Sequence, residues 1–264
     1  MLSAAALAVA VAASPAQARQ RQWPRLVSMR HLDGPWGSAF RRAEHFATRR
    51  GGRVSIALIN PSGQILRYHA TRPYYSASVV KAMLLVAYLN RRGIRGHRLS
   101  ASSRALLHPM ITRSDNGAAT RAYSIVGARG LARVGRRAGM HHLGLLPGWA
   151  DTRIAAGDQA RFFYRIDALV PKRHRRYARH LLSHVIPAQR WGVPKAIPGG
   201  ARAFFKGGWR PEHGGWLVHQ VALVERGGRR VSIAVLTDHD RGFTYGADTI
   251  KGVAKRALGP LARP

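Results

Sequence analysis

The sequence predicts a mixed α/β protein of the α+β type, in which a mainly antiparallel five-stranded sheet carries an inserted all-helical subdomain. Strand-like segments lie near both ends of the chain: RVSIALIN and QILRYHA early, then RAFFKGGW, GWLVHQVALVE and RVSIAVLTD late. The stretch between the two groups has the spacing of helices. Strands from both ends can share one sheet only if the helical stretch leaves that sheet and returns to it.

The remaining elements follow from spacing and turn chemistry. GPWGSAFRRAEHFATRRGG predicts a first helix, because Phe40, Ala43 and Phe46 recur on one side and two glycines end it. Hairpin turns are predicted at PSG, between the first two strands, and at RGGR, between the last two. VVKAMLLVAYL predicts a helix buried on all sides, and YGADTIKGVAKRALG predicts a closing amphipathic helix. The N- and C-terminal helices are therefore expected to flank the sheet.

An N-terminal export signal is predicted ahead of one folded domain. The apolar run from Leu2 to Ala13 is too short to span a bilayer, and the cleavage pattern AQA follows it. One feature of such signals is missing, because no Lys or Arg precedes the run. A buried N-terminal helix is the alternative. The predicted divisions are a signal peptide over 1–18, a linker over 19–33 and a single domain over 34–260, whose α/β part is 34–75 with 200–260 and whose helical part is 76–199. We expect a secreted, cell-wall-associated protein whose mature chain has no transmembrane segment.

The chain is strongly basic and contains no cysteine. Lys and Arg total 44 against 11 Asp and Glu, a formal net charge of +33, and because six of the 44 are Lys the other 38 are Arg. Such a charge favours the anionic cell envelope as a partner. The arginines are spread along the sequence, so we expect no specific nucleic-acid groove; association with nucleic acid through charge alone is the weaker alternative. The absence of cysteine excludes disulfides, thiol nucleophiles and Cys-ligated metals.

A serine and a lysine one turn apart are the first candidates for chemistry. Ser78 and Lys81, in PYYSASVVKAMLLVAYL, project from one face of the predicted helix. Ser78 lies near the helix start, where free backbone N–H groups favour developing negative charge. A serine hydroxyl needs a base to become a nucleophile, and a buried lysine can lose its proton whereas an arginine cannot. Taken alone, the S-x-x-K spacing fits a structural lysine that snorkels from an apolar helix equally well.

Two further motifs follow in order. SDN, at residues 114–116, precedes a predicted helix, and KGG, at residues 206–208, lies in a predicted strand. The ordered set S-x-x-K, S-D-N and K-[TSG]-G is characteristic of class A β-lactamases and penicillin-binding proteins. From about Gly34 to Leu258 the chain resembles this superfamily of serine hydrolases. The resemblance implies a β-lactamase/transpeptidase-like fold, with no metal and no organic cofactor.

The resemblance also implies roles for individual positions. Ser78 would be acylated by a β-lactam or an acyl-D-alanyl peptide, Lys81 would accept its proton, and Ser114 would pass a proton to the leaving nitrogen. Asn116 would hold the substrate amide, and Lys206 would order Ser114 and attract a substrate carboxylate. The oxyanion hole would consist of the backbone N–H groups of Ser78 and of the residue after the K-G-G triplet. The expected catalytic residues are Ser78, Lys81, Ser114 and Lys206, and the expected substrate-binding residues are Asn116, Gly207, Gly208 and Trp209.

Departures from the family pattern limit what the resemblance implies. Gly207 stands where a Thr or Ser hydroxyl usually helps to bind the substrate carboxylate, and Arg210 could compensate. The family's loop glutamate, which directs the hydrolytic water, has no counterpart in AGMHHLGLLPGW. We therefore expect an exported serine hydrolase that acylates Ser78 with β-lactams or peptidoglycan stem peptides and releases the acyl group slowly. A non-catalytic or β-lactam-sensing cell-wall-binding protein with the same fold is the alternative, and a monomer is expected in either case.

Other polar and aromatic groups have plainer interpretations. His180 and His184 have a spacing that can hold zinc, but they lie in a basic helix, which favours a solvated face. His141 and His142 could activate water in the short loop or simply lie at the surface. The remaining expectations are that Asp115 braces its loop, that Asp238 and Asp240 are turn residues, and that Trp191, Trp209 and Trp216 pack in the core rather than line a glycan cleft.

Overall fold

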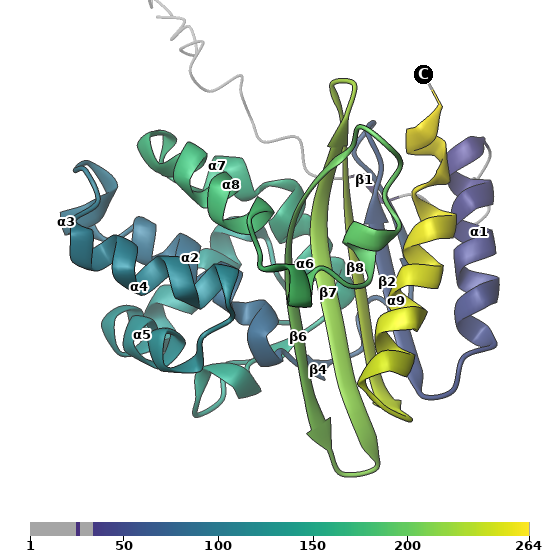
Figure 1. Cartoon of the computed structure of the whole chain (residues 1–264), viewed down its shortest axis with the longest axis horizontal. Helices are drawn as coiled ribbons and strands as arrows, with labels where there is room; N and C mark the ends of the chain where they lie inside the picture. The colour runs from purple at the N-terminus through teal and green to yellow at the C-terminus, as the bar shows by residue number, and fades with distance from the viewer. Residues whose placement is uncertain (1–24, 27–33, 264) are drawn as a thin grey trace, which may run out of the picture.

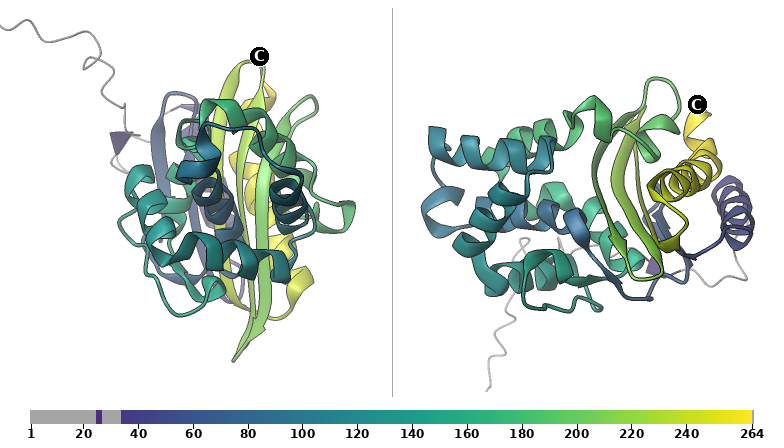
Figure 2. Two further views of the ribbon diagram at one scale, coloured as in Figure 1. Left: turned by 90° about the vertical axis from the view of Figure 1, so that its left-hand side faces the viewer. Right: turned by 60° about the horizontal axis from the view of Figure 1, so that its bottom comes forward.

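The computed structural model describes residues 25–26 and 34–263. The predicted signal peptide and most of the predicted linker lie outside these residues, and the predicted domain divisions stay predictions. Figure 1 shows a central sheet with α1 (Pro35–Thr48) and α9 (Phe243–Ala257) along one face and a block of helices on the other. In Figure 2 the same two helices, from opposite ends of the chain, lie side by side.

The sheet confirms the predicted fold class. Five antiparallel strands are β2 (Arg53–Ile59), β3 (Gln64–Tyr68), β6 (Arg202–Glu212), β7 (Gly215–Arg226) and β8 (Arg229–Asp240). Their order is β3-β2-β8-β7-β6, so β2 from the early part of the chain pairs with β8 from the late part. The short β1 (Arg25–Leu26), within the predicted linker, adds a parallel edge beside β3. The pairing of β2 with β8 is the contact that joins the two ends of the chain in one sheet.

The helical block occupies the chain between β3 and β6. Its helices are α2 (Lys81–Leu89), α3 (Arg92–Arg95), α4 (Ala101–Thr112), α5 (Asn116–Ala138), α6 (Ala156–Tyr164), α7 (Ile166–Leu169) and α8 (Arg175–Ser183). Short 3-10 turns are η2 (Ala77–Val80), η3 (Trp149–Asp151), η4 (Lys172–His174), η5 (Pro187–Gln189), η6 (Val193–Lys195) and, after α9, η7 (Gly259–Ala262). A small ribbon pairs β4 (Tyr74–Tyr75) with β5 (Arg153–Ile154), which places the segment before η2 beside the segment after η3.

Two hydrophobic cores, one on each face of the sheet, explain why the strands are almost continuously apolar. One core joins α1 and α9 to the sheet and includes Phe40, Val218 and Ile250. The other joins the helical block to the opposite face, and α2 is buried along its whole length there, as its all-round apolar sequence predicts. Because both faces are covered, successive residues of a strand meet apolar neighbours on either side.

One polar pair on β8 differs from expectation. Asp238 and Asp240 end the strand β8, as expected, but both are buried members of the strand, so their prediction as turn residues is wrong. Asp238 forms an ion pair with Arg53 on the neighbouring strand, and Thr237 donates a hydrogen bond to Asp240. Burial raises the pKa of Asp240 to about 6. Among the described residues, no helix combines the length and the apolar character needed to cross a bilayer.

Candidate active site

Ser78 lies in the 3-10 turn η2, at the entry to the buried helix α2. Its predecessor Ala77 has φ +42°, a backbone conformation that is costly for a residue with a Cβ, and Ser78 itself is half-buried between buried neighbours. Ser76 anchors the turn, since its N–H donates to the Thr152 carbonyl at 2.8 Å and its Oγ to the Ala150 carbonyl at 3.2 Å. The Ser78 hydroxyl has no hydrogen-bond partner within the described part of the chain.

Lys81 follows one turn later and is fully buried. Its Nζ donates to the Ser114 carbonyl at 2.5 Å and to Asn116 Oδ1 at 2.7 Å, and lies 3.3 Å from Ser114 Oγ. The indole ring of Trp149 lies beside the same amine, with its centroid 4.8 Å from Nζ. The predicted S-x-x-K pair therefore sits where α2 meets the S-D-N loop, and Lys81 is not a snorkelling residue.

The S-D-N loop joins α4 to α5 and is shaped by its first two residues. Ser114 has φ +57°, which turns the chain sharply before the helix. Asp115 is the N-cap of α5, and its Oδ1 accepts a hydrogen bond from the Ala118 N–H at 2.6 Å. The expectation that Asp115 braces this loop is confirmed. Asn116 becomes the first helical residue, with its side chain facing Lys81.

Lys206, on β6, reaches the same hydroxyl from the sheet. Its Nζ lies 3.0 Å from Ser114 Oγ and donates to the Gly207 carbonyl at 2.8 Å. The Ser114 hydroxyl thus lies between two buried amines that come from different layers of the fold. Hydrogen bonds join four residues from three separate motifs here, Lys81, Ser114, Asn116 and Lys206. The predicted nucleophile Ser78 lies one turn before Lys81, and its hydroxyl forms no hydrogen bond to any of these four described residues.

Burial lowers the pKa of both lysines. Desolvation lowers the pKa of Lys81 to about 7, and the nearby Asp115 carboxylate opposes this shift. The pKa of Lys206 lies well below its usual value, first because the amine is buried and second because Lys81 is a cationic neighbour. An amine that loses its proton near neutral pH can act as a base.

The hydrogen-bond partners of Lys81 are compatible with a neutral amine. The Ser114 carbonyl and Asn116 Oδ1 can only accept, so they take the two N–H groups of an uncharged amine. Lys81 Nζ also lies 3.3 Å from Ser114 Oγ, and Lys206 donates to the same hydroxyl oxygen. The arrangement therefore connects Lys81, Ser114 and Lys206 in one short chain of hydrogen bonds.

Gly208 brings the K-G-G strand against the Ser78 turn. A Cβ at this position would lie 2.8 Å from the backbone nitrogens of both Ser78 and Val79, closer than such contacts occur. Only glycine permits this approach between β6 and η2. Trp209, whose N–H is expected to complete the oxyanion hole, is the next residue on the strand. Glycine here is therefore required by the geometry around Ser78.

A family model described as the beta-lactamase enzyme family matches residues 92–260, more than half of the chain. The chain belongs to this family. The match includes the S-D-N and K-G-G motifs and begins after Ser78 and Lys81, which the structure brings to the same place. The family and the fold together support a serine hydrolase of the β-lactamase and penicillin-binding-protein type. None of the curated proteins compared with the chain matches it.

Solved structures give the same fold at low sequence identity. A β-lactamase from Sphaerobacter thermophilus DSM 20745 has a TM-score of 0.74 and 19% identity, covering 88% of this chain and 100% of its own. The TLA-3 extended-spectrum β-lactamase has a TM-score of 0.76 and 12% identity, covering 87% and 100%. A structure titled PBP-A has a TM-score of 0.70 and 16% identity, covering 90% and 98%. At these identities the likeness concerns the fold alone.

The position next to Lys206 departs from the usual pattern of this family for a packing reason. A Cβ at Gly207 would lie 2.9 Å from Cζ2 of Trp191, so the indole fills the space that a Thr or Ser side chain would need. Trp191 packs edge-on against Trp209 and Phe243, and Trp216 contacts Phe243 as well. The expectation that these tryptophans serve packing is confirmed.

Arg210 is already paired. Its guanidinium donates to Asp151 at 2.8 Å and to Glu212 at 2.8 Å, so it is not free to replace the missing hydroxyl of this beta-lactamase-family strand. The idea that Arg210 compensates for Gly207 therefore has no support in this structure. The pair with Asp151 instead ties β6 to η3, next to Trp149.

The loop between α5 and η3 contains no Asp or Glu. Its conformation depends on the buried Asp158, which accepts the backbone N–H groups of His141 and His142 at 2.9 Å and 2.6 Å and pairs with Arg161. Both histidine side chains are exposed, which agrees with a surface role. In place of an acid, this loop ends at Trp149, whose ring lies beside Lys81.

Sequence reasoning missed His219, which hydrogen-bonds to the backbone just before the Ser78 turn. His219 is fully buried on β7 opposite Gly208, its Nε2 donates to the Tyr75 carbonyl at 3.0 Å, and its Nδ1 accepts the Thr237 N–H at 3.1 Å. Burial lowers its pKa to about 4, so it is neutral and both ring nitrogens are used. The available signal was its place on the predicted strand that directly follows the K-G-G strand in the sequence.

Proposed function

We propose that this member of the beta-lactamase family is an exported acyl-serine hydrolase that attacks β-lactams or peptidoglycan stem peptides through Ser78. The observation that carries the proposal is the Ser114 hydroxyl held between the buried amines of Lys81 and Lys206, next to the Ser78 turn. A site that only bound ligands would gain nothing from burying two lysines, since each loses the water that stabilises its charge.

In the proposed acylation step, side chains of this site accept and return the proton of Ser78. Ser78 Oγ forms a bond to the carbonyl carbon as its proton moves to the neutral Lys81, and the carbonyl oxygen takes up negative charge. When the tetrahedral intermediate collapses, the C–N bond breaks and the leaving nitrogen receives a proton through Ser114. The hydrogen bond between Lys81 Nζ and Ser114 Oγ offers the route for that proton. Lys206, also bonded to Ser114, holds the hydroxyl in place.

Charge on the carbonyl oxygen needs donors that do not move. The backbone N–H groups of Ser78 and Trp209 are proposed for this, and the close packing of Gly208 on the Ser78 turn supports it. Loss of one donor of this kind costs about 10²–10³-fold in rate.

Slow release of the acyl group is the second part of the proposal. The short loop offers no acid to direct a water, because Asp158 is bound to the loop backbone and Asp151 to Arg210. Trp149 covers the side of Lys81 that faces this loop. An acyl group on Ser78 is then expected to persist, which also suits a protein that senses β-lactams. The acid-free loop is the observation that favours this second candidate function.

Labelling with a fluorescent penicillin tests the reaction class. We expect a covalent mass gain on the peptide that contains Ser78, no gain in Ser78→Ala, and a normal gain in the control Ser124→Ala, an exposed serine of α5. An unlabelled wild-type chain, or label that persists in Ser78→Ala, contradicts the proposal. The lifetime of the label separates the two candidates: release over minutes indicates a slow hydrolase, and a label that persists for hours indicates a sensor. Rapid turnover of a chromogenic cephalosporin contradicts slow release in both.

A further inference from the structure

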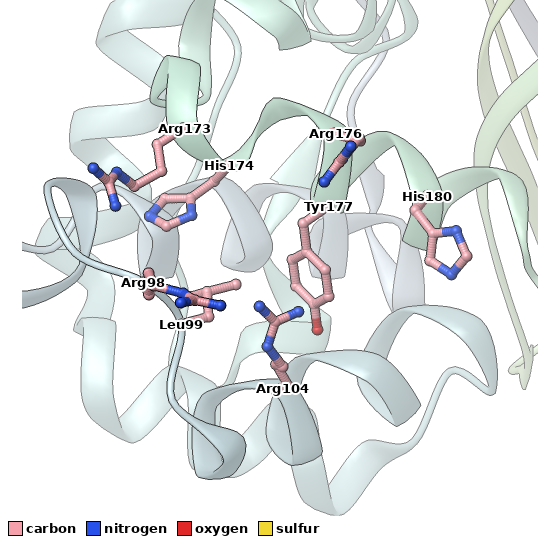
Figure 3. Close-up of a pocket in the computed structure, with 8 residues that line it drawn as sticks. All are labelled: Arg98, Leu99, Arg104, Arg173, His174, Arg176, Tyr177 and His180. Carbon is pink, nitrogen blue, oxygen red and sulfur yellow. The ribbon is translucent and has the colours of Figure 1, made fainter.

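A second basic cluster lies in the helical block and shares no residue with the acyl-serine centre. A pocket of about 350 Å³ opens between the start of α4 and the η4–α8 segment. Figure 3 shows Arg98 and Arg104 on the α4 side, facing Arg173 and Arg176 on the other segment. Tyr177 lies between the two sides, with the Arg104 guanidinium 5.3 Å from its ring centroid.

These four arginines have no counter-charge. None of the residues that line the pocket is acidic. Within the described residues, none of the four guanidinium groups forms an ion pair or a side-chain hydrogen bond, although arginines elsewhere do, such as Arg53 with Asp238. The sequence accounts for this, because residues 45–114 and 168–211, which supply both walls, contain no Asp or Glu. Folding therefore brings like charges together, an arrangement that a bound anion would stabilise.

A buried polar group in the pocket also lacks a partner. The Tyr177 hydroxyl oxygen is inaccessible to solvent and has no hydrogen bond. A buried hydroxyl without a partner is costly, so it is uncommon unless a ligand or water completes it. The phenol has a proton to donate, and an anionic oxygen that displaced the atoms now covering the hydroxyl would accept it. This observation is independent of the charge and indicates the same kind of ligand.

The two walls are held at a fixed separation. His174 is buried, and its Nε2 donates to the Ile94 carbonyl at 2.9 Å, which ties η4 to the end of α3. Leu99 is buried at the base of the pocket. A pocket whose walls are already in place loses little entropy when it binds a ligand.

We propose that this pocket binds a ligand that carries a diphosphate or a similarly dense phosphate group. Planar guanidinium groups form paired hydrogen bonds with phosphate oxygens, and four of them match the charge of a diphosphate. The volume of about 350 Å³ lies near the lower end of the range of roughly 300–1,000 Å³ for small-molecule sites. The diphosphate group belongs either to a free molecule or to a lipid headgroup.

Calorimetric titration of the full chain with inorganic pyrophosphate in 0.15 M NaCl tests the site. We expect one molecule bound per chain and a loss of affinity of about tenfold or more in R104Q/R176Q. The control R129Q/R133Q removes the same two charges from exposed positions on α5 and is expected to bind like wild type. Equal losses in both double variants, equal affinity for citrate, or no binding by the wild type would overturn the proposal.

Tyr177→Phe and vesicle binding sharpen the test. Removing only the hydroxyl is expected to weaken pyrophosphate binding several-fold, and an unchanged affinity counts against the hydroxyl as a donor and so against the proposed site. Binding to vesicles that contain a polyprenyl diphosphate distinguishes the sources: a loss confined to R104Q/R176Q identifies a lipid headgroup, and no loss identifies a free ligand. Circular dichroism melting of each variant shows that it is folded. The test does not depend on Ser78 labelling, so its outcome is independent of the proposed acyl-serine function.

Discussion

Two basic clusters in this chain are built for opposite purposes. Around Ser114, the two lysines Lys81 and Lys206 are buried, and burial lowers the pKa of each. Between α4 and α8, four arginines line an open pocket and have no acidic partner there. An amine can lose its proton when water is removed, whereas a guanidinium group keeps its charge in any protein environment. The comparison indicates that the two lysines take part in proton transfer, whereas the four arginines provide a permanent positive charge.

The largest effect is expected from exchanging the basic group at the centre. Lys81→Arg keeps the positive charge but cannot accept a proton, so the rate of Ser78 acylation should fall by about 10²–10⁴-fold. Stopped-flow labelling with a fluorescent penicillin measures it. Lys251→Arg, on the exposed side of α9, is the matched control, and Lys81→Met, which has a similar shape and no charge, shows whether folding is the cause. Normal labelling of Lys81→Arg would contradict the role of a neutral amine.

The pH dependence sharpens the same contrast. Because burial lowers the pKa of Lys81 to about 7, the amine is neutral above that pH, and the acylation rate should fall about tenfold per pH unit below it. Asp115 raises the pKa of Lys81, so Asp115→Asn should shift the midpoint to lower pH. Asparagine also caps helices, which preserves α5. A profile without a midpoint, or one that moves to higher pH in Asp115→Asn, argues against Lys81 as the base.

The approach of β6 to the Ser78 turn gives a smaller effect. In Gly208→Ala the new Cβ would lie 2.8 Å from the backbone nitrogens of Ser78 and Val79, so the strand and the turn must separate. We expect a loss of about 1–3 kcal/mol in the free energy of unfolding and about a tenfold slower acylation. Thermal melting and labelling measure the two effects. Gly259→Ala, in the distant turn η7, is the control, because its φ is not positive and a Cβ there would meet nothing within 4 Å.

The smallest effect is expected from the reverse exchange in the arginine pocket. R104K/R176K keeps both charges and loses only the paired hydrogen bonds, so pyrophosphate binding should weaken by about threefold. Calorimetric titration against wild type and R104Q/R176Q measures it. A loss as large as that of the glutamine variant would show that geometry rather than charge decides binding, and the contrast between the two clusters would then be weaker than we infer.

Much of the fold could be predicted from local patterns. The strands, the flanking helices and the fully buried α2 follow from periodicity and turn residues, because each element must bury its own apolar face. The order of the segments also predicted that strands from both ends share one sheet, although not that β2 is the strand that pairs with β8. Local patterns also predicted the candidate catalytic residues, since each belongs to a short motif of fixed spacing: Ser78, Lys81, Ser114 and Lys206.

Other features depend on contacts between segments that are far apart in the sequence. The sequence around Gly207 does not indicate that Trp191 fills the adjacent space, or that Arg210 forms an ion pair with Asp151. His219 and Trp149 lack a motif, and they matter only because strand pairing and the short loop bring them to the Ser78 turn and to Lys81. Asp238 and Asp240 were misassigned because polar residues at a strand end resemble a turn until a partner such as Arg53 is known.

The sequence by itself determined the elements, their order and the reactive groups that are available. These are one serine near a helix start, a few lysines among many arginines, and a loop without an acidic residue. Tertiary structure decided which basic groups keep their charge. Two amines meet at one hydroxyl away from water, and four guanidinium groups gather in a pocket whose lining residues include no carboxylate. The physical reason is that solvation and charge pairing depend on neighbours in space, and only the folded chain selects those neighbours.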